Sequence, residues 1–166
     1  MQYGLDVVTI RMVKAPSWYS DKPLENGEDV ARFLSKEFLA YDREIVGVLN
    51  MTTDGKVINM NIVCVGTLDG ALVMPREIFK SSILSNAAWI LLFHNHPSGR
   101  LVPSKDDKFL TQRVREAGMI LGIELKDHVI IGNREGHYYS FHEAGILEKD
   151  FRSDYVKERY LSDMVR

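Results

Sequence analysis

The apolar run AWILLFH, residues 88–94, constrains the fold more than any other feature of the sequence. It has the length of a strand and no alternation of apolar and polar residues, which is typical of a strand covered on both faces. Segments with helical spacing of apolar residues lie on either side of it, one opening at Pro75 and the other at Ser104. The sequence therefore predicts a central buried strand in an α/β layered domain with a mixed sheet.

The remaining elements are predicted from apolar periodicity and from turn residues. The Asp-Gly pair in TTDG, residues 52–55, suits a tight hairpin because glycine accepts a positive φ angle. A second turn is expected at NREG, residues 133–136. We expect helices at 28–40, 74–87 and 104–118, and further strands at 7–13, 43–51, 56–66, 123–132 and 137–141.

A chain of 166 residues suits a single domain with its own core. We expect that domain to span residues 1–147. Residues 148–166 are highly charged with interspersed aromatic residues, which predicts a helical tail or an arm that faces a partner. No feature of the sequence points to a particular oligomeric state.

Charge and composition exclude several classes of function. The formal net charge is −2, so no overall basic field exists to drive generic binding to phosphate backbones. Cys64 is the only cysteine and cannot form an internal disulfide, and the N-terminus lacks the layout of a secretory signal, so we expect a reducing cytoplasm. The run at 88–94 is far shorter than the roughly 20 residues of a membrane span, so we expect no association with a membrane.

Polar residues gather where the central strand ends, in FHNHPSGRLVPSKDD, residues 93–107. His94 and His96 are two residues apart, so both side chains can point to one face of the strand. Two imidazoles with Asp107 on the next helix would supply the three protein ligands of a catalytic zinc site. A structural alternative exists for each part, because Ser104 and Asp107 have the spacing of a capping box and a histidine can simply end a strand. Their coincidence at one strand end favours the metal site.

The pattern H-x-H-x7-S-x2-D in HNHPSG and PSKDD closely resembles the RadC-like branch of the JAMM, or MPN, metalloproteases. The similarity extends over about residues 40–142, through DREIVGVLN and REAGMILGIELKDHVIIG, and more loosely over the first 40 residues. The resemblance implies a three-layer α/β/α domain similar to cytidine deaminases. It also implies Zn²⁺ held by His94, His96 and Asp107, with Ser104 in contact with the water on the metal.

The family pattern places a glutamate upstream of the histidines, and Glu44 matches it. A nearby carboxylate can take a proton from water and return it to a leaving amine, so Glu44 is the candidate general acid/base. Its structural alternative is a solvated residue at a strand start. Ser104 could stabilise a developing oxyanion, and it could also cap its helix. The resemblance thus predicts a zinc hydrolase that cleaves a peptide or isopeptide bond in a peptide or protein substrate.

Other histidines are expected to be structural. His128 and its neighbour Asp127 lie in a predicted strand and have no place in the ligand set. His137 and His142 are five residues apart, a spacing that puts them on one face of neither a strand nor a helix, so a second metal site is not predicted.

Alternative functions come from other classes. RadC-like proteins are linked by name to DNA repair, so a DNA-repair-associated accessory or binding module with little or no catalysis is the second hypothesis. Larger members of that family carry an N-terminal helix-hairpin-helix region, and we expect the sequence ahead of the metal domain to be too short for one. That expectation and the acidic net charge leave an indirect association with DNA. Zinc deamination is disfavoured because a P-C-x-x-C arrangement needs a second cysteine.

Overall fold

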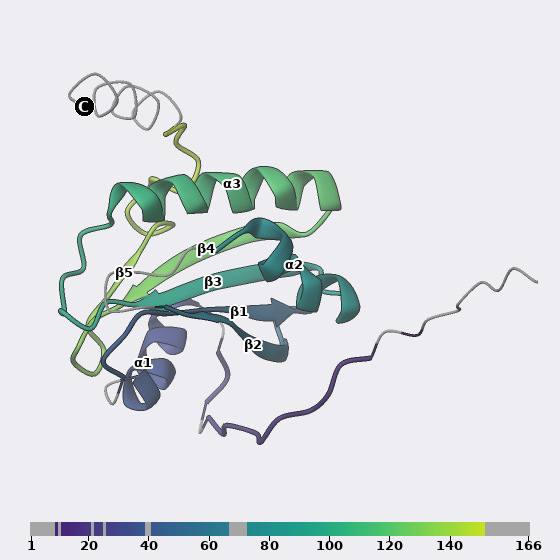
Figure 1. Cartoon of the computed structure of the whole chain (residues 1–166), viewed down its shortest axis with the longest axis horizontal. Coiled ribbons are helices and arrows are strands. Elements are labelled where there is room, and N and C mark those ends of the chain that lie inside the picture. The colour runs from purple at the N-terminus through teal and green to yellow at the C-terminus, as the bar shows by residue number, and fades with distance from the viewer. Residues whose placement is uncertain are drawn as a thin grey trace, which may run out of the picture.

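The computed structural model describes residues 9, 11–20, 22–24, 26–38, 41–66 and 73–151. Three helices and five strands follow one another along this part of the chain (Figure 1). In chain order they are α1 (Gly27–Phe38), β1 (Ile45–Met51), β2 (Val57–Val65), α2 (Pro75–Leu84), β3 (Trp89–Asn95), α3 (Lys105–Leu121), β4 (Glu124–Ile131) and β5 (Tyr138–Ser140).

The strands form one mixed sheet in the order β2-β1-β3-β4-β5. β3 pairs antiparallel with β1 and parallel with β4, while β2 and β5 are antiparallel to their neighbours. All seven residues of β3 are buried, as expected for a strand covered on both faces. The prediction of a central strand in a mixed sheet is therefore confirmed.

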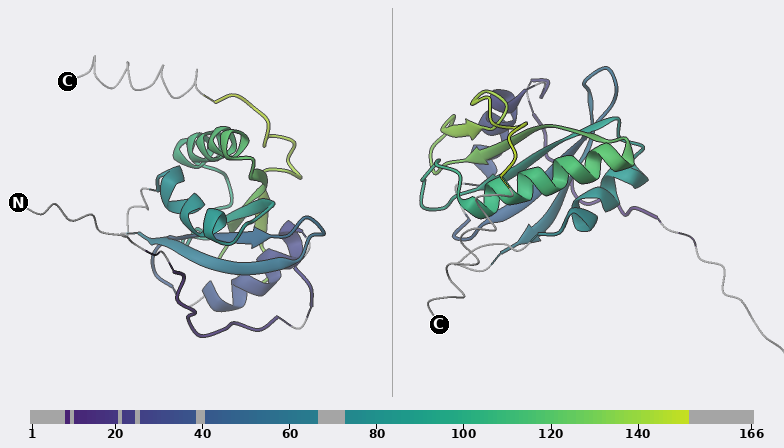
Figure 2. Two further views of the ribbon diagram at one scale, coloured as in Figure 1. Left: turned by 90° about the vertical axis from the view of Figure 1, so that its right-hand side faces the viewer. Right: turned by 90° about the horizontal axis from the view of Figure 1, so that it is seen from above.

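Helices cover both faces of the sheet, which confirms the three-layer α/β/α arrangement (Figure 2). On one face, α1 packs Val30 and Leu34 against Leu91 and Phe93 of β3. On the other face, α2 and α3 pack against the alternate side chains of β3, which include Leu92. Neighbouring residues of one strand thus belong to different cores. His94, two residues after Leu92, points to the same face of the sheet as Leu92.

The helix ends follow their capping residues. The Asn26 side chain accepts a hydrogen bond from the Asp29 N–H (2.9 Å), so Asn26 caps α1. Pro75 opens α2, as predicted, since the first turn does not use its missing N–H. The sequence places Gly118 or Gly122 near the end of the helix predicted at 104–118, and α3 ends at Leu121 because Gly122, with a φ of 68°, closes it in a left-handed cap. Residues 39 and 40 of the predicted first helix lie outside the described residues.

The predicted strand at 7–13 is wrong for its described residues, since 9 and 11–13 are not in a strand. Met12 is 50% exposed and Val13 is 92% exposed, so residues 11–13 bury no continuous apolar face. Strand propensity depends on packing against neighbours, and the exposed Val13 lacks such packing. The rest of that prediction and the predicted helix beyond residue 151 lie outside the described residues. Within the described part of the chain, every helix is too short or too polar to cross a membrane.

Candidate metal centre

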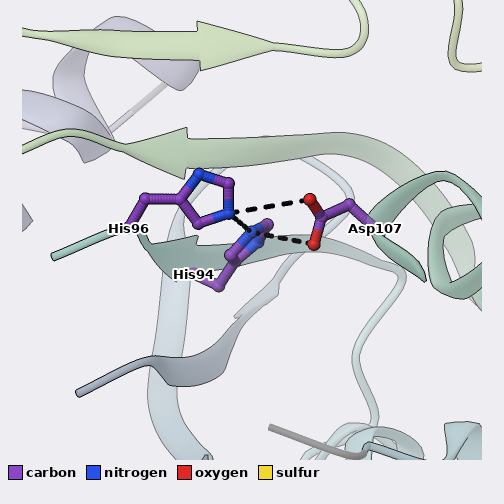
Figure 3. Close-up of side chains that lie close together, drawn as sticks. All are labelled: His94, His96 and Asp107. Atoms are coloured by element: carbon purple, nitrogen blue, oxygen red, sulfur yellow. Dashed lines mark hydrogen bonds and ion pairs between the residues drawn. The ribbon is translucent and has the colours of Figure 1, made fainter. Parts of the chain in front are cut away.

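His94 and His96 meet at the carboxyl end of β3. His94 is the last but one residue of the strand and His96 follows its end. Their rings lie on the same side, as predicted, with 3.0 Å between the two Nε2 atoms (Figure 3). The His94 side chain is 3% exposed and the His96 side chain 11%. The rigid, buried strand therefore holds both rings at a place that solvent can just reach.

A turn and a helix start bring Asp107 to the same place. Gly99 has a φ of 75°, and a side chain there would meet Asn133, so the turn after β3 needs glycine on both counts. The chain then enters α3, whose first turn contains Asp107. Asp107 Oδ1 lies 3.1 Å from His94 Nε2, and Oδ2 lies 3.6 Å from His96 Nε2 (Figure 3). The three predicted ligands thus converge from two elements.

Ser104 forms the capping box that is the structural alternative to a role in the metal site. Its hydroxyl accepts from the Asp107 N–H (3.1 Å), and its own N–H donates to Asp107 Oδ2 (2.6 Å). The hydroxyl proton also points to Asp107 Oδ2 (2.6 Å). Ser104 therefore caps α3 and also orients the carboxylate, so the structural and the functional readings of this pair are compatible. A contact of Ser104 with water or substrate stays a prediction.

The charges of this cluster are coupled. Burial raises the pKa of Asp107, but the contacts of its carboxylate with His94 and His96 outweigh burial and hold the pKa well below its usual range. Burial also lowers the pKa of His96, whereas its contacts with Asp107 and with the Arg100 carbonyl raise the pKa above its usual value. Asp107 is therefore a carboxylate at neutral pH, which is the form that binds a cation.

Glu44 lies beside the histidines but is more exposed. It immediately precedes β1, and its side chain is 31% exposed. Glu44 Oε1 lies 4.0 Å from His96 Nε2, which places the carboxylate beside the ligands without joining the tight cluster. Its backbone carbonyl accepts from the Gly66 N–H (2.8 Å), which ties it to the segment after β2. The structure thus brings Glu44 to the site, and its part in proton transfer stays a prediction.

Asn95, between the two histidines, fixes the backbone around Glu44. The Asn95 side chain accepts from the Ile45 N–H (2.7 Å) and donates to the Arg43 carbonyl (3.2 Å). It therefore fixes the backbone of the residues on either side of Glu44. This role of Asn95 is not among the sequence-based predictions, although a buried amide at the end of an apolar strand must find hydrogen-bond partners and is therefore a recognisable candidate.

His128 of β4 lies behind His94 and contacts it, which the sequence did not predict. His128 Nε2 lies 2.8 Å from His94 Nδ1, and its ring stacks on Phe141. Burial lowers the pKa of His128 well below its usual value. His128 is not part of the converging cluster, as predicted, but it contacts one of the candidate ligands. Only the pairing of β3 with β4 reveals this contact, because 33 residues separate the two histidines in sequence.

The donor atoms fit a zinc ion in type and in spacing. Two imidazole nitrogens and one carboxylate oxygen form a common ligand set for zinc. With metal–ligand distances of about 2.0–2.2 Å and tetrahedral geometry, neighbouring donors lie roughly 3.3 Å apart. The two Nε2 atoms lie 3.0 Å apart, and each lies near a different oxygen of Asp107, at 3.1 and 3.6 Å. With one donor atom taken from each residue, all three donors lie within 4.8 Å of one another. Among the described residues, His94, His96 and Asp107 are the only cluster of three or more histidine, cysteine or acidic side chains that could hold a metal.

This geometry defines a class of protein, an α/β/α domain with a candidate metal site at the end of its central strand. The model of the RadC-like JAB domain family matches residues 24–146. The chain belongs to this family, which confirms the resemblance drawn from the HNHPSG and PSKDD motifs.

Curated relatives support the same assignment. A UPF0758 protein of Rubrobacter xylanophilus is 48% identical over 119 residues, which cover 72% of this chain and 51% of that protein. A UPF0758 protein of Thermotoga maritima is 45% identical over 112 residues, 68% of this chain and 50% of that protein. The chain therefore spans about half the length of the curated relatives it matches.

Proposed function

We propose that this protein is a zinc-dependent hydrolase of the JAMM type that cleaves a peptide or isopeptide amide bond. The observation that carries the proposal is the convergence of His94, His96 and Asp107, with the Glu44 carboxylate next to His96. A JAB domain with this donor set is suited to hydrolysis.

The ligand side of the site is rigid. His94 projects from a fully buried strand, His96 is the residue that follows its end, and Ser104 holds one carboxylate oxygen of Asp107 through two hydrogen bonds. A bound zinc ion would polarise a carbonyl oxygen and lower the pKa of a water molecule. The residues present are thus arranged to bind the ion with little reorganisation.

Glu44 supplies the acid/base group. Its exposed carboxylate can accept a proton from the attacking water and deliver it to the leaving nitrogen, which an amide needs because an amide anion is a poor leaving group. Its backbone is held by Asn95 and Gly66, while its side chain is 31% exposed and so accessible both to the attacking water and to the leaving nitrogen. Fixed backbone and exposed carboxylate together suit a group that moves protons.

Zinc stoichiometry tests the site first. We expect about one zinc per chain in purified protein, measured by inductively coupled plasma mass spectrometry after exhaustive dialysis. The double variant His94→Ala, His96→Ala should contain none. His142→Ala is the matched control, because His142 is exposed and outside the cluster, and it should keep its zinc. Full zinc content in the double variant would remove the site assignment.

Hydrolysis tests the chemistry second. The zinc-loaded protein should be assayed against a library of peptides and of lysine residues acylated on Nζ. For any substrate found, Glu44→Gln should retain zinc and lose at least about 100-fold in kcat, the usual range for a general acid/base. Glu124→Gln, an exposed glutamate at the opposite end of the sheet, should match the wild type. Unchanged turnover in Glu44→Gln would remove its acid/base role.

A further inference from the structure

A chain of buried hydrogen bonds runs behind His94 and returns to the third candidate ligand. His94 Nδ1 contacts His128 Nε2 (2.8 Å), and His128 Nδ1 contacts Thr111 Oγ1 (2.6 Å). The Thr111 hydroxyl donates to the backbone carbonyl of Asp107 (2.6 Å). Both His128 and Thr111 are fully buried, so their polar atoms depend on these contacts. The chain therefore connects β3, β4 and α3.

The end of this chain determines where its protons lie. The Asp107 carbonyl can only accept, so the one proton of the Thr111 hydroxyl points to it. Thr111 Oγ1 must then accept from His128, which places a proton on His128 Nδ1. A neutral imidazole has one N–H donor and one acceptor nitrogen, so with its proton on Nδ1 His128 presents the lone pair of Nε2 and accepts from His94 Nδ1.

His96 reaches the same state by a simpler route. Its Nδ1 contacts the backbone carbonyl of Arg100, which can only accept, so His96 also carries its proton on Nδ1. The Nε2 atoms of His94 and His96 then turn lone pairs toward each other across 3.0 Å, beside the Asp107 carboxylate. Two lone pairs and a carboxylate at this distance repel one another unless a cation or a proton lies between them.

We propose that His128 is a positioning residue, which, together with Thr111, holds His94 in the Nδ1–H tautomer and so keeps His94 Nε2 available to a metal ion. The inference rests on the metal site of the proposed function but not on hydrolysis. It assigns His128 a task that ring packing alone would not require. Partners behind metal-binding histidines commonly fix tautomer and ring orientation in this way.

The tautomer can be read in metal-free protein, by long-range ¹H–¹⁵N NMR of the histidine rings. In the wild type, we expect His94 Nε2 to resonate as an unprotonated nitrogen and Nδ1 as a protonated one. Thr111→Val keeps the shape of the side chain but removes the hydroxyl, so the Nε2–H tautomer of His94 should gain population. A wild-type His94 protonated on Nε2 would overturn the proposal.

Zinc affinity, measured by competition with a chromogenic chelator, gives the second readout. His128→Phe keeps an aromatic ring against Phe141 but removes the acceptor, and we expect affinity to fall about 10–100-fold. His128→Gln offers an amide oxygen in place of Nε2 and should recover most of that loss. A purely structural His128 would make the two variants equivalent, or leave affinity unchanged in both, and either result would overturn the proposal.

Thermal unfolding of the metal-free variants separates folding from positioning. Should His128→Phe fail to fold, Thr111→Val still decides the question, because its zinc affinity must fall together with the shift in tautomer. Thr111→Val with wild-type affinity and wild-type tautomer would overturn the proposal. A wild-type protein that binds no zinc would instead contradict the proposed function, and the tautomer of His94 could still be measured. A zinc-loaded protein without hydrolytic activity would leave both readouts intact.

Discussion

Two adjacent residues of β4, Asp127 and His128, lie on opposite faces of the sheet and are both buried, but their hydrogen bonds connect different parts of the fold. Asp127 faces α1 and accepts hydrogen bonds from the Ser140 hydroxyl (2.7 Å) and from the backbone N–H groups of His142 (3.0 Å) and His128 (2.7 Å). These partners lie on β4 itself, at the last residue of β5 and two residues beyond it. Asp127 therefore ties β4 to the segment at and after β5.

His128 faces α3, and its side-chain hydrogen bonds lead away from its own hairpin. They join His94 on β3 to Thr111 on α3, and through Thr111 to the backbone of Asp107. Buried polar groups must find partners on either face, so burial and polarity alone do not distinguish a site from a structural tie. The difference between the two faces shows that convergence of side chains from several elements on a solvent-accessible point is the informative sign.

Substitution of Asp107 should have the largest effect on zinc affinity and stability, because Asp107 belongs to both the metal cluster and the helix cap. Asp107→Ala should lower zinc affinity by more than the roughly 10–100-fold typical of residues behind the ligands. It should also destabilise metal-free protein by about 1 kcal/mol, because Ser104 N–H loses its acceptor and the N-terminus of α3 loses a charge. Chelator competition and urea unfolding measure the two quantities.

Asp107→Asn is the matched control for that variant. Its amide oxygen can still accept from the Ser104 N–H, so most of the stability of metal-free protein should return, while zinc affinity should stay low without the carboxylate charge. Equal stability of the two variants would show that the cap contributes nothing. If zinc affinity returned together with stability in Asp107→Asn, Asp107 would affect zinc binding only through the helix cap and would not be a ligand.

Asn95 tests whether the backbone of Glu44 must be fixed. Asn95→Ala leaves the Ile45 N–H and the Arg43 carbonyl without their partner, so we expect a loss of about 2 kcal/mol in the free energy of unfolding. Zinc content should be unchanged, and kcat on any substrate found should fall because the general base is displaced.

Asn50→Ala controls for lost stability alone. Asn50 is also a buried amide, bonded to Asn59 and Ser81, but it lies level with Ile90, four residues before His94 along β3. It should lower stability to a similar degree and leave kcat unchanged. Equal losses of kcat in the two variants would show that Asn95 acts through stability only.

The sequence was sufficient for the features that depend on local pattern. Period-two spacing placed His94 and His96 on one face, and the Ser104 and Asp107 spacing predicted both a capping box and a ligand. The upstream position of Glu44 came from the family resemblance, since no local pattern links it to residues 50 positions away. The contact of His128 with His94 was not predictable, because it depends on which strand lies next to β3 and in which register.

The same dependence explains why the described residues of the predicted strand at 7–13, which are 9 and 11–13, form no strand. Its apolar, β-branched composition satisfies the local rule for a strand, but a strand also needs a free sheet edge and a surface to bury. Val13 remains almost fully exposed, so that second requirement is not met. Pattern therefore predicts an element reliably where burial is certain, as for residues 88–94, and less reliably near the chain ends.

Asp127 should give the smallest effect, confined to the other face of the sheet. Burial raises the pKa of Asp127, and the hydrogen bonds it accepts offset this only in part. The folded state therefore holds the proton more tightly than the unfolded state does. The stability that Asp127 contributes is fully present below the unfolded pKa of a carboxyl group and is lost as the pH rises through the higher folded value.

Asp127→Asn removes this titration but keeps an oxygen for the two backbone N–H groups, and its amide can donate to Ser140. The free energy of unfolding of the wild type, relative to that of Asp127→Asn, should thus decrease as the pH rises from 3 to 7. At pH 7 the two should differ by less than about 1.5 kcal/mol, and zinc affinity should agree within about twofold. Urea unfolding of metal-free protein across this range provides the measurement. A difference that grows with pH would contradict the sign of the shift, and a large loss of zinc affinity would show that the two faces of β4 are not separable.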